Sequence, residues 1–319
     1  MKKVYLVLPC YNEELVLKDS ASKLKSLMED LISKGVISND SKAVFVNDGS
    51  TDLTLKILKE ICEEDHLFMA ISLAHNSGHQ NAILAGMMAV KDECDAVITL
   101  DADLQHDINM IPEFIKKYEE GYEIVYGVRK SRGGEGFFKK LTGNAFYSIM
   151  QMFGTNVIRN HADYRLLSTK ALNALEKYEE VNLFLRGIIP QIGFASTILE
   201  YEEKPRLAGE SKYSLSKMLK LASDGITSFS IRPLQAITFV GFFFFLVSIV
   251  MIIYALVVLC KGGTVAGWTS IVAPLWMIGG VQLLALGIVG EYIGKIYMET
   301  KHRPRYEIDI IVKDGEIRG

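Results

Sequence analysis

The chain has 319 residues, of which 49% are hydrophobic and 23% are charged, and 35 Lys and Arg residues stand against 38 Asp and Glu residues. This size predicts one large domain or two small ones, and the balanced charge argues against a nucleic-acid-binding protein, which normally carries a dense basic face. The cysteines, Cys10, Cys62, Cys94 and Cys260, have no CxxC spacing, so neither a zinc knuckle nor a disulfide framework is predicted.

Residues 1–126 alternate short β-rich runs with amphipathic stretches. We expect strands at 4–8, 43–46, 69–73 and 96–100, and helices at 14–34, 51–64, 80–90 and 111–120. Strands that alternate with helices are typical of a doubly wound sheet. The sequence therefore predicts an α/β, Rossmann-like domain with a mostly parallel sheet.

Polar clusters follow each of these expected strands, at residues 9–13, 47–52, 76–80 and 101–106. Ligands of open α/β sheets bind beyond the carboxyl ends of the strands, so we expect these four loops to form one binding rim. The chain has neither GxxxxGK[ST] nor GxGxxG, so it lacks the glycines that hold phosphates in P-loop and dinucleotide-binding proteins.

Asp101 and Asp103 follow the apolar run that ends at Leu100. In an extended chain, residues i and i+2 point to the same side, so we expect both carboxylates to face one ligand. Two such carboxylates can bind a hard divalent cation, whose remaining positions are filled by water and diphosphate oxygens.

Two long apolar segments follow near the C-terminus. No charged residue occurs between Arg232 and Lys261, or between Lys261 and Glu291. Each gap exceeds the ~20 residues needed to cross a bilayer. We expect transmembrane helices at 233–260 and 268–290, joined by an external loop at 261–267. A pair of core helices in a soluble protein is the alternative, but neither segment has the polar stripe typical of one.

Basic residues cluster on both sides of this hairpin, whereas its loop contains only Lys261. The positive-inside rule therefore places both the domain at 1–212 and the tail at 291–319 in the cytoplasm, with the protein in the cytoplasmic membrane. Residues 213–232 are expected to form amphipathic helices at the interface. The apolar run at the N-terminus is too short for a signal peptide and is expected to be the first strand.

Six motifs share their order and spacing with a known family: Pro9-x-Tyr-Asn-Glu13, Val46-Asn-Asp-Gly-Ser-Thr-Asp52, Asn76-x-Gly-His-Gln80, Leu100-Asp-Ala-Asp-Leu-Gln105, Ala162-Asp-Tyr-Arg-Leu166 and Arg206-x-x-Gly-Glu-Ser-Lys-Tyr213. With them the chain resembles glycosyltransferase family 2, which has the GT-A fold. Within that family it resembles the polyprenyl-phosphate glycosyltransferases, which include dolichol-phosphate mannose synthases and bactoprenol glucosyltransferases. The two expected membrane spans are more similar to the bacterial glucosyltransferase branch.

The resemblance implies a nucleotide-sugar site and a metal site. The residues implied to bind the donor are Pro9, Tyr11, Glu13, Asp48, Asp101, Arg206, Ser211 and Lys212, the last three on a segment that closes over the diphosphate. Those implied to bind Mg²⁺ or Mn²⁺ are Asp101, Asp103 and Gln105. The histidines His75, His79 and His106 lack a helical HxxxH arrangement, so no second metal is predicted.

Asp163 and Arg165 match a segment that lies near the reacting sugar in the family, and with Asp103 they are the expected catalytic residues. Arg129 follows the next expected strand, where its guanidinium group can grip the acceptor phosphate. Lys139 and Lys140 either join Arg129 or form a basic surface that faces anionic lipid.

The expected activity is inverting transfer of a hexose from a nucleotide sugar, with UDP-glucose favoured, to membrane polyprenyl phosphate for cell-envelope glycans. GDP-mannose, UDP-N-acetylglucosamine, UDP-galactose and the nucleotide derivative of a modified pentose stay open as donors. A processive polysaccharide synthase is disfavoured because QxxRW is absent, with Trp268 and Trp276 both in the second apolar segment. The intact acidic loops argue against a non-catalytic adaptor. Glycines at 279, 280, 287 and 290 offer small-residue faces that allow a homo-oligomer.

Overall fold

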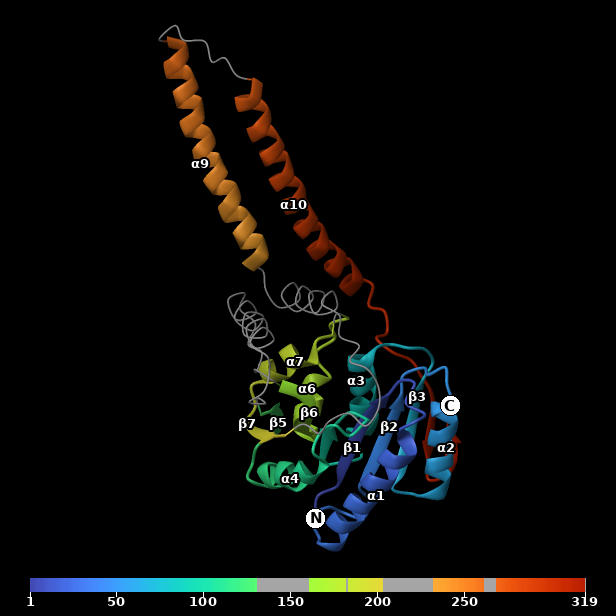
Figure 1. Ribbon diagram of the computed structural model, residues 1–319. Coiled ribbons are helices and arrows are strands. Elements are labelled where there is room, and N and C mark those ends of the chain that lie inside the picture. The colour runs from blue at the N-terminus through green and yellow to red at the C-terminus, as the bar shows by residue number, and fades with distance from the viewer. Residues whose placement is uncertain (131–160, 182, 203–231, 261–267, 319) are drawn as a thin grey trace. The chain divides into compact units, whose positions relative to one another are not determined.

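The computed structural model describes residues 1–130, 161–181, 183–202, 232–260 and 268–318 (Figure 1). They form two compact units. One holds the sheet with its helices, and the other holds α9 (Arg232–Cys260) and α10 (Trp268–Thr300). The expected interfacial segment lies outside the described residues except for its last residue, and the expected external loop at 261–267 lies wholly outside them.

The first unit is built on one sheet with the strand order β7-β5-β6-β4-β1-β2-β3-β8-β9. Among the described strands, only β6 and β8 run against the others, which confirms the expected mostly parallel α/β sheet. The strands are β1 Val4–Cys10, β2 Lys42–Asn47, β3 Phe68–Leu73, β4 Ala96–Thr99, β5 Ile124–Arg129, β6 His161–Ser168, β7 Ser196–Tyr201, β8 Ile308–Lys313 and β9 Glu316–Arg318.

Helices cover both faces of the sheet. The expected helices appear within a few residues, as α1 Leu17–Ser33, α2 Thr54–Glu64, α3 His79–Val90 and α4 Ile111–Glu119. Apolar residues of α1, α2 and α4 share one buried cluster with Leu6, Leu8 and Phe45. α3 covers the other face, where a Cβ on Gly86 would lie 2.6 Å from Val7 and Val46 side-chain atoms. This close approach fixes α3 against β1 and β2.

Shorter elements complete the unit: η1 Ile108–Met110, α6 Thr169–Leu175, α7 Leu185–Ile188 and η2 Ile189–Ile192. Ser168 caps α6 by accepting a hydrogen bond from the Ala171 amide. α7 carries one of the side chains of the candidate site.

The C-terminal residues belong to the sheet rather than to a separate tail. β8 pairs antiparallel with β3 and β9 with β8, so the two strands extend the sheet beyond β3 on the side of α2 (Figure 1). Two ion pairs of 2.6 Å hold them, Lys42 with Asp314 and Lys313 with Glu93. The chain after α10 thus returns to the sheet edge next to β3.

We expect Val312→Ala to destabilise this unit by roughly 2 kcal/mol, because Val312 is 1% exposed and the change removes two buried methyl groups and leaves a cavity. Ile317→Ala on β9 is the matched control, since Ile317 is 55% exposed. Urea unfolding of both variants measures the difference. Equal small effects would mean that β8 does not contribute to the core.

The second unit contains a helix suited to a membrane. Within α10, the stretch Met277–Thr300 has 24 residues and a mean hydropathy of 1.5, which by length and composition is enough to cross a bilayer. α10 runs ten residues beyond the expected end at residue 290. α9 is helical over the whole first expected span.

Candidate active site

Three loops at the carboxyl ends of β1, β2 and β3 are tied together by hydrogen bonds. The Asn12 amide donates to Ser50 Oγ at 3.0 Å, and Asn12 Oδ1 accepts from the Thr51 amide at 2.9 Å. Asp48 is buried, and its two carboxylate oxygens accept from the Ser77 and Gly78 amides at 2.7 and 3.0 Å. Asp48 therefore shapes the start of α3.

Gly49 allows these loops to approach one another. Its φ is +61°, and a Cβ at this position would lie 2.5 Å from the Asn76 amide nitrogen and the His75 carbonyl carbon. Any other residue would therefore force the loops after β2 and β3 apart.

The residues expected to hold the donor base and ribose lie along this network. Pro9 is buried in β1, whereas the Tyr11 side chain just beyond it is 47% exposed. The Glu13 amide donates to Thr54 Oγ1 at 2.9 Å. Tyr11 thus presents an aromatic face to solvent, which suits stacking on a nucleobase.

Asp101 and Asp103 lie on a turn. β4 ends at Thr99, and the Leu104 amide donates to the Asp101 carbonyl at 3.1 Å, with Leu104 at a φ of +49°. The expectation of an extended chain at this point is wrong, because the strand ends at Thr99 and Asp101 is the first residue of the turn. The loop still places both acidic residues at the rim, since β4 lies beside β1.

The neighbours of this turn are more buried than a solvated loop would be. Gln105 donates its amide to Asp103 Oδ1 at 3.2 Å, and its Nε2 is buried with no hydrogen-bond partner within the described part of the chain. His106 is fully buried, and its Nδ1 accepts from the Asp101 amide at 3.2 Å. Burial lowers the pKa of His106, so the ring is neutral at pH 7.

The oxygen atoms of Asp101, Asp103 and Gln105 suit a divalent cation whose coordination shell is completed by a bound ligand. The described residues contain no group of three or more His, Cys, Asp or Glu side chains that could enclose a metal. The Asp101 side chain is 32% exposed, so its hard oxygens can be reached from solvent. Two carboxylates and an amide at an open rim fit Mg²⁺ or Mn²⁺ when diphosphate oxygens and water supply the remaining ligands.

Asp163 enters the same rim on β6. Because β6 runs antiparallel to β4, its first residues lie where β4 ends, and Thr99 Oγ1 donates to the Asp163 carbonyl at 2.5 Å. The Asp163 carboxylate accepts hydrogen bonds from the fully buried Arg165 and from Arg186 on α7, whose Nη2 and Nε lie at 2.9 and 3.3 Å. Two guanidinium groups thus face one carboxylate.

This pairing controls the ionisation of Asp163. Burial on its own would raise the pKa of the Asp163 carboxyl, but the charges of Arg186 and Arg165 hold that pKa well below its usual value. Asp163 is therefore ionised at neutral pH and is a weak proton acceptor.

His79, at the start of α3, links the two acidic residues. Its Nε2 lies 3.7 Å from Asp101 Oδ1 and 3.4 Å from Asp163 Oδ2, and the side chain is 48% exposed. Burial lowers the pKa of His79, but the hydrogen bond to Asp163 and the charge of Asp101 outweigh it, and the net shift is upward. The neighbouring Gln80 accepts a hydrogen bond from the Leu185 amide at 2.8 Å, which ties α3 to α7.

Sequence reasoning missed His79, His106 and Arg186. The motif that ends at Gln80 contains His79, but its spacing to the other histidines suggested no site. The one signal for Arg186 was a single charge within the apolar run 183–189.

Of the residues expected to bind the acceptor phosphate, the structure describes only Arg129, at the end of β5. Its Nε donates to Tyr201 Oη on β7 at 3.4 Å. The others lie outside the described residues, as does the segment expected to close over the donor: Lys139, Lys140, Arg206, Ser211 and Lys212.

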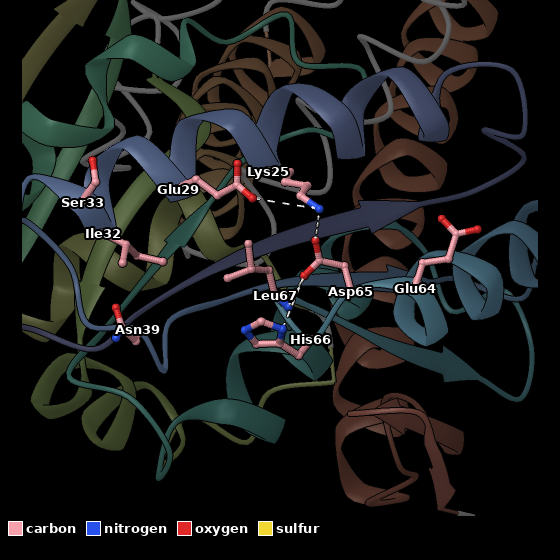
Figure 2. Close-up of a pocket in the computed structure, with 9 residues that line it drawn as sticks. All are labelled: Lys25, Glu29, Ile32, Ser33, Asn39, Glu64, Asp65, His66 and Leu67. Carbon is pink, nitrogen blue, oxygen red and sulfur yellow. Dashed lines mark hydrogen bonds and ion pairs between the residues drawn. The ribbon is translucent and has the colours of Figure 1, made fainter.

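A hollow of about 530 Å³ lies elsewhere in this unit, between α1 and the connection from α2 to β3 (Figure 2). Lys25 and Asp65 form an ion pair of 2.6 Å in it. Because Asp65 and His66 precede β3, this hollow is at the opposite end of the strands from the rim. It is therefore not part of the candidate active site.

Comparison with known proteins gives the family of this chain. The Glycosyl transferase family 2 profile matches residues 5–176. YkoT of Bacillus subtilis, an uncharacterised glycosyltransferase, is 47% identical over 305 residues, which cover 96% of this chain and 90% of YkoT. The bactoprenol glucosyl transferase of Shigella phage SfV is 36% identical over 311 residues, which cover 96% of this chain and 98% of the phage protein.

Solved structures are more distant. Mannosyl-3-phosphoglycerate synthase from Rubrobacter xylanophilus is 14% identical with a TM-score of 0.47, over 71% of this chain and 73% of that enzyme. This similarity is too low to support any statement about function.

The α/β fold and the family match together identify a GT-A-like glycosyltransferase. The chain belongs to glycosyltransferase family 2.

Proposed function

We propose that this protein transfers a hexose from a nucleotide sugar, with UDP-glucose favoured, to a membrane polyprenyl phosphate, and that the product is a β-linked polyprenyl-phosphate sugar for the cell envelope. The observation that carries the proposal is that the chain is similar to a bactoprenol glucosyl transferase over 98% of that protein's length. The acidic rim supports it, because a leaving nucleoside diphosphate needs its charge neutralised.

The donor is assigned to the loops after β1, β2 and β4. Tyr11 stacks on the base, Glu13 and Asp48 line the base and ribose, and Asp101, Asp103 and Gln105 hold Mg²⁺ or Mn²⁺ against the diphosphate. Once bound, the cation stabilises the charge of the leaving group as a Lewis acid. Arg206, Ser211 and Lys212 are proposed to close over the same diphosphate.

The acceptor is assigned to basic residues at and after the end of β5. Arg129 grips the lipid phosphate, and Lys139 and Lys140 extend this site. The exposed part of Arg186 adds positive charge next to Asp163. The acceptor oxygen is already anionic at neutral pH, so it attacks the anomeric carbon in line without a general base and inverts the configuration. Asp163 and Arg165 then orient Arg186 and the reacting groups.

The lipid acceptor also accounts for the membrane helices. At ~0.8 kcal/mol per buried CH₂ a polyprenyl chain does not leave the bilayer, so the enzyme has to work at the membrane surface. We assign 233–260 and 268–290 to a transmembrane hairpin, 261–267 to its external loop and 213–232 to the interface. The catalytic unit and both termini are placed in the cytoplasm.

This topology predicts which cysteines react in intact cells. Thr264→Cys, in the external loop, should be labelled by an impermeant maleimide, whereas Glu316→Cys, on the exposed strand β9, should react only after permeabilisation. Cys260→Ser is the background for both, since Cys10, Cys62 and Cys94 are buried. Labelling of Glu316→Cys in intact cells would reverse the topology.

A donor screen tests the nucleotide-sugar assignment. The Tm of the purified protein is measured with Mn²⁺ and each UDP- or GDP-sugar in turn, with Asp103→Asn as the control. We expect UDP-glucose to raise the Tm of the wild type but not the Tm of Asp103→Asn. A processive synthase would elongate a glycan, and a non-catalytic adaptor would show no Tm shift with any donor.

A further inference from the structure

One buried histidine contacts both the main chain and the carboxylate of Asp101. His106 Nδ1 accepts the hydrogen bond of the Asp101 amide at 3.2 Å, and His106 Nε2 lies 3.5 Å from Asp101 Oδ2. A nitrogen that accepts a hydrogen bond has no proton of its own, so the proton of the neutral ring is on Nε2. Nε2 is buried beside the Asp101 carboxylate and has no hydrogen-bond partner within the described part of the chain.

The ring is held in turn by two strands of the sheet. His106 stacks on Tyr164 of β6 with centroids 5.0 Å apart and planes at 19°, and it meets the edge of Tyr201 of β7 at 5.6 Å. Tyr164 Oη also donates to the Asp107 carbonyl at 3.1 Å, next to His106. The imidazole is 0% exposed, so it cannot change its position without disturbing this packing.

We propose that His106 is a positioning residue that fixes Asp101 as a ligand of the divalent cation. Nδ1 holds the main chain of the turn through the Asp101 amide, and the buried ring packs beside the carboxylate, with Nε2 3.5 Å from Oδ2. The inference rests on the proposed cation site at Asp101 and Asp103. Groups that hold metal ligands in place from behind typically change metal affinity 10- to 100-fold when they are lost.

The test is the Mn²⁺ affinity of the purified full-length chain, measured by electron paramagnetic resonance with Mn²⁺ as the only ligand. His106→Phe keeps a ring that can stack on Tyr164 but removes both nitrogens, and we expect it to bind Mn²⁺ about 10- to 100-fold more weakly. His106→Asn restores an acceptor near the Nδ1 position, so we expect it to recover part of the affinity.

Two controls separate the outcomes. His161→Phe also removes a buried imidazole, one that packs edge-on against Tyr126 at 5.0 Å, and should bind Mn²⁺ as the wild type does. Asp101→Asn tests the cation site itself, and wild-type affinity there would refute that site and the inference together.

If Asp101→Asn loses Mn²⁺, unchanged affinity in His106→Phe would overturn the role of His106 alone. An equal loss of Mn²⁺ affinity in His161→Phe would also overturn the role of His106, because the effect would then come from the loss of packing around a buried ring. If His106→Phe does not fold, His106→Asn decides: the proposal requires a smaller but measurable loss of affinity, since asparagine restores the acceptor but not the ring that stacks on Tyr164.

Discussion

Asp103→Asn should reduce kcat roughly 100- to 1,000-fold while the protein still folds. Asp103 is on the turn after β4, where its carboxylate accepts a hydrogen bond from the Gln105 amide at 3.2 Å, which an asparagine oxygen can also accept. The substitution therefore removes charge from the cation site and can keep this hydrogen bond. Sugar transfer under saturating donor, together with Tm, measures the two effects separately.

Asp107→Asn is the matched control for this experiment. It removes one negative charge from the same loop, and asparagine can still cap η1, as Asp107 does through the Asn109 amide. EDTA should abolish transfer by the wild type, and Mn²⁺ or Mg²⁺ should restore it. Full turnover in chelator, or an equal loss in Asp107→Asn, would remove the cation from the proposal.

Asp163→Asn should have the largest effect on stability, with a loss of about 3–5 kcal/mol in the free energy of unfolding. The carboxylate is the partner of the buried Arg165 guanidinium, and without its charge that cation stays buried and uncompensated. Asp30→Ala is the control, because Asp30 and Lys34 form an exposed pair worth at most about 1 kcal/mol. Similar losses in both variants would contradict the buried-charge account.

The same carboxylate gives a pH signature. Its folded pKa is depressed, so its contribution to stability is complete above the unfolded pKa of about 3.9 and is lost as pH falls through the folded pKa. The stability difference between wild type and Asp163→Asn should therefore be constant near pH 7 and shrink below about pH 4. A difference that grows on acidification would have the wrong sign.

The parallel half of the fold was predictable from sequence because its signals are local. Apolar runs and helical periodicity place β1 to β4 and α1 to α4 within a few residues. β8 was missed because its pairing with β3 joins residues far apart in the chain, and a short strand after a membrane segment looks like a tail. The end of α10 was missed for a different reason, since the helix continues past the charged Glu291.

The candidate site shows the same division. The loops that follow the strands indicate a rim, and the structure brings Asp101 and Asp163 within reach of the same His79 side chain. The partner of Asp163 on α7 could not be predicted, because Arg186 is 23 residues further along the chain and arrives through α7. His106 is next to the acidic motif, but its role depends on its burial and on which ring nitrogen accepts the hydrogen bond of the Asp101 amide. The spacing of the motif predicts neither.

The central claim is sugar transfer to a polyprenyl phosphate, and the most direct test is to count label from UDP-[¹⁴C]glucose in the lipid extract. Purified protein is incubated with Mn²⁺ and vesicles that contain or lack polyprenyl phosphate, with Asp103→Asn as the blank. The account predicts labelled lipid only when the wild type, Mn²⁺ and polyprenyl phosphate are all present. Release of free glucose at the same rate with and without the lipid, and no labelled lipid from this or any other nucleotide sugar, would contradict it.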